Sequence, residues 1–463
     1  MFKDFRQTAR PTPPASPVAP TPRAPIVAPS PVAPAVPAAD PAWHDLKQVL
    51  HEAILNQMNL GLIEQVERAD LKREIGALVA PILQQRGQTL TGDRFRLLVN
   101  ELMDEVLGLG PLEPLLADPT VSDILVNGPD KIFVERRGLL ERSPLRFRDE
   151  KHLLRIIDKI VSRVGRRIDE SQPWVDARLP DGSRVNAIIK PCAIDGASLS
   201  IRKFSADKLT LDKLVGYGAL NDTAAQFLAA CVQSRMNALI SGGTGSGKTT
   251  MLNAMSAFID HRQRIVTIED AAELQLQQDH VVRLETRPAN AEGTGLISQR
   301  ELVKNALRMR PDRIVIGEVR GSEAFDMLQA MNTGHDGSMT TIHANTARDA
   351  MSRLEQMVVM IGADFPMSAV RTQIAAGINI VVQLNRLADG SRRVMSISEV
   401  TGLENGVVLM QDIFAFRKTG LDADGRVMGR FAPTGIRPKC MEQLQASGFD
   451  LPLGTFTAPQ EVA

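Results

Sequence analysis

The sequence predicts an α/β protein whose largest domain is a parallel sheet covered by helices on both faces. In the second half of the chain, four short apolar segments typical of buried strands alternate with segments of helical periodicity. A glycine-rich loop with phosphate-binding spacing joins the first of these strands to a helix. Helical stripes and then β-branched, strand-like runs come before this region. We therefore predict three folded units in the 463 residues, which suffice for two or three domains.

The N-terminal part is expected to begin with a tail and a small helical bundle. Residues 1–42 are mostly Pro, Ala and Val, a composition that cannot pack a core and predicts an extended segment. A plain tether is the simpler interpretation of this tail, and docking to a partner is the alternative. Residues 43–108 follow a helical period in three apolar stripes. Pro81 and the glycine-rich LGLGP at 107–111 are the expected helix breaks.

Residues 109–204 are expected to form a mixed α+β domain. The segments SDILVNG, KIFVERRG and SRVNAIIK are strand-like, and LPDGSR contains an Asp-Gly turn signal. A run of helical period interrupts them, with Leu153, Ile156, Ile157 and Ile160 on one face.

The rest of the chain is divided into a linker, a third domain and a tail. We interpret 205–218 as the linker, 219–432 as the α/β domain and 433–463 as the C-terminal tail. A hairpin is expected around Asp389-Gly390. The predicted strands of the α/β domain are NALIS (237–241), RIVTIED (264–270), DRIVIGE (312–318) and SMTTIHA (338–344).

The composition narrows the classes of function. Lys plus Arg and Asp plus Glu are 54 each, whereas a protein that coats nucleic acid usually has a basic excess. The three cysteines are far apart, and we interpret them as free thiols in a reducing compartment. No apolar run approaches the ~18 residues that span a bilayer, and the N-terminus lacks the apolar middle of a secretory signal. We expect a cytoplasmic protein with at most a peripheral membrane role.

The stretch GGTGSGKTT predicts a nucleotide-binding loop. Glycines allow successive backbone N–H groups to converge on phosphate oxygens, and the N-terminus of the following helix adds partial positive charge. Lys248 is expected to reach the β- and γ-phosphates of ATP, and the Thr249 hydroxyl to bind Mg²⁺. The predicted nucleotide-binding residues are Gly242, Gly243, Thr244, Gly245, Ser246, Gly247, Lys248, Thr249 and Thr250.

Carboxylates at the ends of two predicted strands are candidates for hydrolytic chemistry. Gly317 stands where an Asp usually holds the metal, and Glu318 after it is the candidate general base. Glu269 ends a neighbouring strand, and we predict that it binds Mg²⁺, partly through water. The adjacent Asp270 is expected to orient neighbouring groups.

Two histidines flank the last predicted strand, in GHDGSMTTIHAN. His343 follows the strand beside the expected γ-phosphate position, and we predict that it senses this phosphate or orders the attacking water. For His335, which precedes the strand, a structural and a functional role are equally open.

Taken together, these segments resemble the type II/type IV secretion ATPase superfamily. GGTGSGKTT, TIEDAAEL, RIVIGEVRG and SMTTIHAN are similar to its Walker A, Asp-box, Walker B and His-box motifs. RMRPDRIVIGEVRG and AMNTGHDGSMTTIHAN look most like the CpaF branch, which assembles tight-adherence (Tad/Flp) pili. The resemblance covers about residues 100–415 and leaves out the proline-rich tail.

The resemblance implies a ring-shaped homo-hexamer of subunits with an N-terminal PAS-like domain and a RecA-like P-loop ATPase domain. ATP would lie between the two domains, with Arg184 and Arg202 as γ-phosphate contacts. Arginines used in this way contribute on the order of 10³–10⁵ in rate. The Gly-Glu ending of the Walker B strand is usual in the family, so Gly317 is no defect by this comparison. A tetracysteine zinc site, present in some pilus ATPases, cannot be built from three cysteines.

The leading hypothesis is a hexameric, Mg²⁺-dependent ATPase that powers assembly of a Tad/Flp pilus, with retraction as an open extension. It would act on inner-membrane platform proteins and be held peripherally at the inner membrane through them, with no nucleic acid as ligand. A type IV secretion ATPase that exports protein or DNA is the alternative, although 4% aromatic residues are few for base stacking. A nucleotide-gated scaffold that does not hydrolyse ATP is a third hypothesis, supported only by Gly317.

Overall fold

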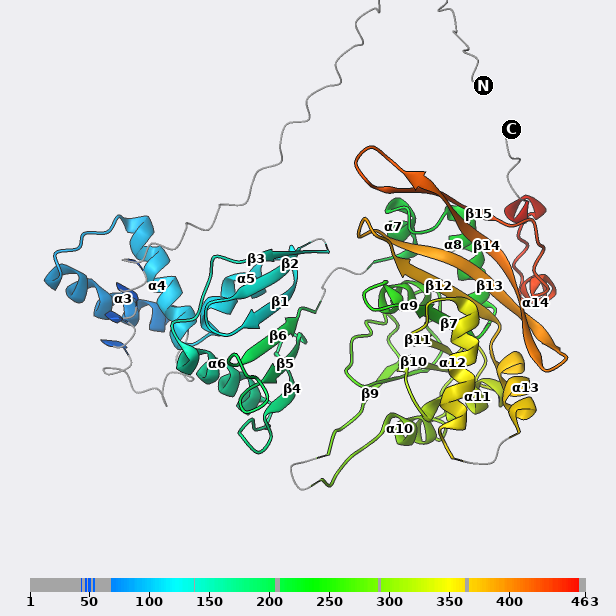
Figure 1. Cartoon of the computed structure of the whole chain (residues 1–463), viewed down its shortest axis with the longest axis horizontal. Coiled ribbons are helices and arrows are strands. Elements are labelled where there is room, and N and C mark those ends of the chain that lie inside the picture. The colour runs from blue at the N-terminus through cyan, green and yellow to red at the C-terminus, as the bar shows by residue number, and fades with distance from the viewer. Residues whose placement is uncertain are drawn as a thin grey trace, which may run out of the picture.

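The computed structural model of the protein contains two sheets with their own helices (Figure 1). It describes residues 43, 46, 47, 49, 50, 53 and 54, and then 68–457 with gaps at 137, 205–208, 290–292 and 363–365. The predicted tail at 1–42 lies outside the described residues. Within the described part of the chain, no helix is long and apolar enough to cross a membrane.

Two helices, α3 (Arg68–Gln85) and α4 (Gly92–Val106), begin the continuous part of the chain. Their buried faces share one core with Leu46, Leu50 and Ile54. The predicted end at the glycine-rich segment is confirmed, since α4 stops at Val106.

The predicted helix break at Pro81 is wrong, because Pro81 lies inside α3. A proline in a helix removes one backbone hydrogen bond, here the bond to the carbonyl of Ala77. Ala77 and Pro81 are both exposed, so water can reach that carbonyl. Buried Val79 and Leu83 on either side of Pro81 hold the helix on its core.

The N-terminal sheet is antiparallel with the order β3-β2-β1-β6-β5-β4. One face of the sheet packs on α6, whose Leu153, Ile156 and Ile157 are buried. The strand-like segments and the helical run predicted for this region are therefore confirmed. The predicted Asp-Gly turn joins β4 to β5, with Gly182 at φ +92°. The elements are η1 (Gly110–Leu112), α5 (Glu113–Ala117), β1 (Val121–Asn127), β2 (Ile132–Arg136), β3 (Leu139–Arg142), α6 (Glu150–Arg163), β4 (Trp174–Arg178), β5 (Arg184–Ile188) and β6 (Ser198–Arg202).

The segment predicted to be a linker is partly helical. Helix α7 (Leu211–Gly216) occupies its second half, and Leu211 and Leu214 are buried in the core of the C-terminal domain. A helix of six residues is too short to show a periodic pattern, so the sequence offered little signal for it.

The C-terminal sheet has nine strands in the order β15-β14-β13-β12-β7-β11-β10-β8-β9. From β12 to β9 all pairs are parallel, as predicted, whereas β12 to β15 are antiparallel, with the predicted Asp389-Gly390 hairpin between β12 and β13. The strands are β7 (Ala238–Gly242), β8 (Ile265–Glu269), β9 (Val281–Glu285), β10 (Arg313–Val319), β11 (Met339–Ile342), β12 (Ile380–Arg386), β13 (Arg392–Glu404), β14 (Val407–Leu421) and β15 (Val427–Pro433).

Helices cover both faces of this sheet, which confirms the predicted α/β architecture. Alternate residues of each buried strand point to opposite faces, so Ile240 joins one core and Leu239 the other. The first core contains α8 and α9, and the second contains α10 to α13. These helices are α8 (Asp222–Gln233), α9 (Lys248–Ser256), α10 (Gln299–Ala306), α11 (Glu323–Asn332), α12 (Ala347–Val359) and α13 (Met367–Gly377).

The predicted C-terminal tail also contains folded elements. Helix α14 (Met441–Ala446) and the turn η2 (Leu453–Phe456) place Met441, Leu444 and Phe456 in the first core of the sheet. Buried Glu399 of β13 holds the start of α14, because its carboxylate accepts the backbone N–H of Cys440 at 2.6 Å. The expectation of a tail failed because this anchor lies 41 residues away in the sequence.

A fully buried arginine, Arg313, holds the sheet at the end opposite the predicted phosphate loop. Its guanidinium donates to the carbonyl of Gly337 at 3.0 Å, to the carbonyl of Val232 at 2.8 Å and to Gln263 Oε1 at 2.7 Å. Gly337 has φ +82°, and a Cβ there would lie 1.9 Å from Arg313 Nη1. The position therefore accepts only glycine.

We expect Gly337→Ala to lower the free energy of unfolding by about 3 kcal/mol or more, because it strains the backbone and displaces the hydrogen bonds of a buried charge. Urea denaturation monitored by circular dichroism measures this. Gly420→Ala is the control, since a Cβ on Gly420 would have no atom within 4 Å and the backbone there has no positive φ. Equal stability of the two variants would contradict the prediction.

Candidate active site

The phosphate loop connects β7 to α9 at the carboxyl edge of the parallel strands. A Cβ on Gly242 would lie 2.4 Å from Ser246 Oγ and 2.6 Å from the carbonyl oxygen of Leu384, so β12 and the loop exclude any side chain there. Gly245 and Gly247 have φ of +68° and +96°, a conformation that glycine adopts without strain. The loop thus has the geometry of a backbone anion nest at a helix N-terminus.

Lys248, the first residue of α9, is only 8% exposed. Its ammonium donates to the carbonyls of Gly242 at 3.1 Å and Gly243 at 3.0 Å, and Nζ lies 3.2 Å from His343 Nε2. Burial lowers the pKa of Lys248, and the nearby charge of Glu318 opposes this effect. The loop therefore holds a desolvated cation beside the residue predicted to sense phosphate.

Glu318, near the end of β10, is in contact with two groups of the site. Its Oε1 lies 2.7 Å from His343 Nε2, and its Oε2 accepts from Arg320 at 2.6 Å (Nη2) and 2.9 Å (Nε). The same guanidinium lies 3.5 Å from Asp270 Oδ2, so it bridges the acidic groups at the ends of β8 and β10. Glu318 and Asp270 were predicted from the sequence, whereas Arg320 was not, although Arg320 stands two residues after Glu318 in the same motif.

The two histidines lie at opposite ends of β11. His343 follows the strand and joins Lys248 and Glu318, while burial lowers its pKa, so the imidazole is mainly neutral at pH 7. His335 precedes the strand, and its Nδ1 lies 3.2 Å from the carbonyl oxygen of Pro311. Of the two roles left open for His335, this position fits the structural one.

Glu269 ends β8 and is 3% exposed. Its Oε2 accepts the backbone N–H groups of Glu273 at 2.7 Å and Leu274 at 3.0 Å, whereas its buried Oε1 has no hydrogen-bond partner in the described part of the chain. A Cβ on Gly317 would lie 2.7 Å from Glu269 Cγ. Gly317 therefore makes room for the Glu269 carboxylate, at the position where the sequence lacks the usual Asp.

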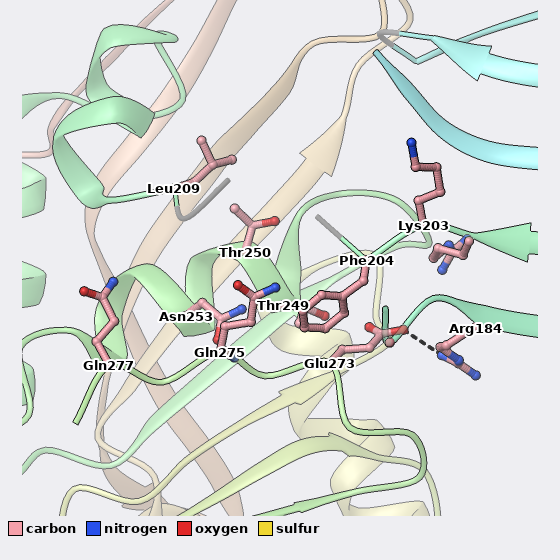
Figure 2. A pocket seen from close by; sticks show the side chains of 12 residues that line it. Arg184, Lys203, Phe204, Leu209, Thr249, Thr250, Asn253, Glu273, Gln275 and Gln277 are labelled. Carbon is pink, nitrogen blue, oxygen red and sulfur yellow. Dashed lines mark hydrogen bonds and ion pairs between the residues drawn. The ribbon is translucent and has the colours of Figure 1, made fainter. Parts of the chain in front are cut away.

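A pocket of about 250 Å³ lies between the N-terminal and C-terminal domains (Figure 2). Both predicted arginines and the predicted Mg²⁺ ligand Thr249 line it, so the structure brings these three residues to one cavity. Thr250, which was also predicted to contact the nucleotide, lines the pocket as well. The remaining lining residues were not predicted as site residues, and they are Gly182, Lys203, Phe204, Leu209, Asn253, Glu273, Gln275 and Gln277.

Both arginines are paired with carboxylates. Arg184 Nη1 donates to Glu273 Oε1 at 2.8 Å across the domain junction, as Figure 2 shows. Arg202 Nε donates to Asp123 Oδ1 at 3.1 Å within the N-terminal domain. A third arginine that the sequence reasoning missed, Arg178, also crosses the junction and donates to the carbonyl of Ala272 at 2.9 Å.

A parallel sheet with a glycine-rich loop at its carboxyl edge is typical of nucleotide-binding α/β proteins. The profile of the type II/IV secretion system protein family matches residues 105–428, and the chain belongs to this family.

Curated relatives agree with this assignment. A Mycobacterium tuberculosis (strain H37Rv) protein whose name calls it a putative conjugal transfer protein is 40% identical over 312 residues, which are 66% of this chain and 88% of the relative. Conjugal transfer protein TrbB of Rhizobium radiobacter is 32% identical, over 63% of this chain and 87% of its own length. Type IV secretion system protein VirB11 of Brucella suis is also 32% identical, over 63% of this chain and 88% of its own length.

Burial raises the pKa of Glu269 from 4.5 to about 7, so the folded protein binds this proton more tightly than the unfolded chain. The stabilisation is therefore complete below pH ~4.5 and is lost as the pH rises through about 7. Without Mg²⁺ and nucleotide, we expect Glu269→Gln, which cannot ionise, to exceed the wild type in free energy of unfolding by on the order of 3 kcal/mol at pH 8 and by less than about 1 kcal/mol at pH 5.

Urea denaturation at pH 5, 6, 7 and 8 measures the difference between the two proteins. Glu404→Gln, at the exposed end of β13, is the control and should follow the wild-type pH profile. A constant difference between wild type and Glu269→Gln over this range would show that Glu269 does not titrate there.

Proposed function

We propose that the protein is a Mg²⁺-dependent ATPase whose active site lies between a RecA-like C-terminal domain and a PAS-like N-terminal domain. The observation that carries the proposal is the contact of Glu318 with His343, beside the ammonium of Lys248 at the phosphate loop. The candidate base, the imidazole and the ammonium that we propose to bind phosphate thus form one cluster.

The loop fits a bound triphosphate. The space that a Cβ would fill at Gly242 is taken by neighbouring atoms, and Gly245 and Gly247 have a left-handed backbone, which leaves backbone N–H groups close to any phosphate in the loop. Lys248 would exchange its bonds to two loop carbonyls for bonds to phosphate oxygens. We propose Gly243, Thr244, Ser246 and Thr250 as further contacts of the nucleotide.

The site also fits Mg²⁺. Thr249 lies in the first turn of α9 and lines the interdomain pocket, and the unpartnered Oε1 of Glu269 is, among the described residues, a buried acceptor for a metal-bound water. When bound, Mg²⁺ would neutralise charge on the β- and γ-phosphates. The Glu269 side chain lies beside Gly317, which supports Glu269 as the replacement for the usual Asp and argues against a scaffold that does not hydrolyse ATP.

Within this arrangement Glu318 would accept a proton from the attacking water. Arg320 donates to one carboxylate oxygen of Glu318, while His343 contacts the other oxygen and would orient it. Arg184 and Arg202 would supply positive charge to the γ-phosphate from the N-terminal domain.

We propose that the ATPase is a motor that works as a homo-hexamer, with three folded units at 43–108, 109–204 and from α7 through η2. Assembly of a Tad/Flp pilus through inner-membrane platform proteins is our preferred role, supported by the amino-acid sequences of the Walker B and His-box motifs. A type IV secretion or conjugation ATPase is the second candidate, because the named relatives belong to conjugal transfer and type IV secretion. Both roles place the protein at the cytoplasmic side of the inner membrane through its partners.

Stimulation by DNA separates the pilus role from the DNA-exporting form of the second candidate. ATP turnover is measured with and without single-stranded and double-stranded DNA at fixed, low salt, because phosphate contacts weaken steeply as salt rises. The pilus role predicts equal turnover in all samples. Several-fold stimulation by either DNA would favour the DNA-export role.

We expect Glu318→Gln to lower kcat for ATP hydrolysis at least ~100-fold while ATP affinity changes by less than about threefold, since the amide cannot accept the proton of water. Phosphate release and nucleotide titration measure the two quantities. Glu404→Gln is the matched control and should behave as wild type. Unchanged turnover in Glu318→Gln would exclude Glu318 as the base, and tight ATP binding by Lys248→Ala would contradict the proposed role of the loop.

A further inference from the structure

A hairpin that plays no part in the proposed chemistry lies against the phosphate loop. Strands β12 and β13 form it, and β12 runs parallel to β7, with Leu384 beside Gly242. The last residue of β12 is Arg386 and the first residue of β13 is Arg392, so two arginines flank the turn next to the loop.

The side chain of Arg392 binds the backbone of the phosphate loop. Its Nε donates to the carbonyl of Gly245 at 2.9 Å, and its Cδ lies 3.7 Å from the point where a Cβ on Gly247 would stand. The absence of side chains at these two glycines lets the arginine reach the backbone. The bond fixes one peptide unit in the middle of the loop.

Arg386 lies beside the same loop and contacts the other domain. Its Nη1 lies 3.7 Å from the Cβ position of Gly245, and its Nη2 donates to the carbonyl oxygen of Gly138 at 2.5 Å. Gly138 belongs to the turn between β2 and β3 of the N-terminal sheet and has φ +83°. In Figure 1 the ends of β2 and β3 that this turn joins face the C-terminal domain. A single guanidinium therefore lies next to the phosphate loop while it is hydrogen-bonded to the β2–β3 turn.

We infer that Arg386 is a positioning residue that couples the phosphate loop to the N-terminal domain through the β2–β3 turn. This inference rests on the proposed ATPase function. A bound phosphate would attract the Arg386 guanidinium electrostatically, and the hydrogen bond to Gly138 would pass this attraction to the domain that carries Arg184 and Arg202. Arg386 acts on catalysis by holding that domain in place, without contacting the reacting atoms.

A positioning role predicts that turnover falls more than binding. Arg386→Ala should lower kcat for ATP about tenfold and change KM by less than about threefold, because the loop and Lys248 still bind the nucleotide. Arg386→Lys should recover at least about a third of the wild-type kcat, since an ammonium can still donate to the Gly138 carbonyl. Arg430→Ala is the control, because Arg430 is an exposed arginine on β15 of the same sheet.

A second measurement follows the coupling itself. Amide hydrogen exchange of residues 132–142 is compared with and without Mg²⁺ and a non-hydrolysable ATP analogue, in the full chain. The analogue should slow exchange in this segment at least about threefold in wild type and in Arg430→Ala, and leave it unchanged in Arg386→Ala. Exchange in residues 242–250 should be slowed in all three proteins, which reports binding independently of the coupling.

The outcomes separate the inference from the proposed function. Suppose that the wild type hydrolyses ATP and shows slowed exchange at 242–250. If Arg386→Ala then has the same kcat and the same protection of 132–142, the inference is overturned and the proposed ATPase function stands. A wild-type protein with neither turnover nor protection at 242–250 would overturn the proposed function and the inference together.

Discussion

The buried ammonium of Lys248 is the interaction on which the candidate site depends. A cation that is 8% exposed needs several partners, and here they are two loop carbonyls and the group formed by His343 and Glu318. These partners come from the ends of β7, β10 and β11, which meet because parallel strands end at one edge of the sheet. The polar contacts of this one charge thus link the loop, Glu318 and His343.

A second chain of contacts leads from this edge to the N-terminal domain. Arg184 bonds the Glu273 carboxylate, and the backbone N–H of Glu273 bonds the Glu269 carboxylate next to Gly317. The Arg184–Glu273 pair is partly exposed, and such pairs contribute only about 0–1 kcal/mol. Arg184 could therefore exchange Glu273 for a phosphate at small cost, which suits a site that assembles when nucleotide arrives.

The sequence predicted those features that depend on local pattern. The four buried strands, the glycine loop and the Asp-Gly turns have distinctive residues at fixed spacing, and the structure contains each of them. Helices α7 and α14 were missed because each has six residues and is held by buried contacts with distant parts of the chain. The break at Pro81 was predicted from the local effect of proline on a helix, whereas the core on the other face of α3 keeps this segment helical.

The same distinction holds for the site. Glu269, Glu318 and His343 lie at the ends of strands that the pattern identified, so their position at one edge of the sheet could be foreseen. The roles of Glu273 and Arg386 could not be foreseen, because they arise from side-chain contacts between elements far apart in the sequence; Arg386 and Gly138 are 248 residues apart. Arg320 stands two residues after Glu318, so the motif itself contained the signal for that pair. Pattern locates strand ends, and only the folded chain shows which charged side chains reach them.

The most direct test of the central claim is a structure of the full chain with Mg²⁺ and a non-hydrolysable ATP analogue. The account predicts that Lys248 Nζ bonds phosphate oxygens, and that Arg184 and Arg202 leave Glu273 and Asp123 and lie within hydrogen-bond distance of the γ-phosphate. A nucleotide bound in the loop while both arginines keep their carboxylate partners would contradict a site completed across the domain junction.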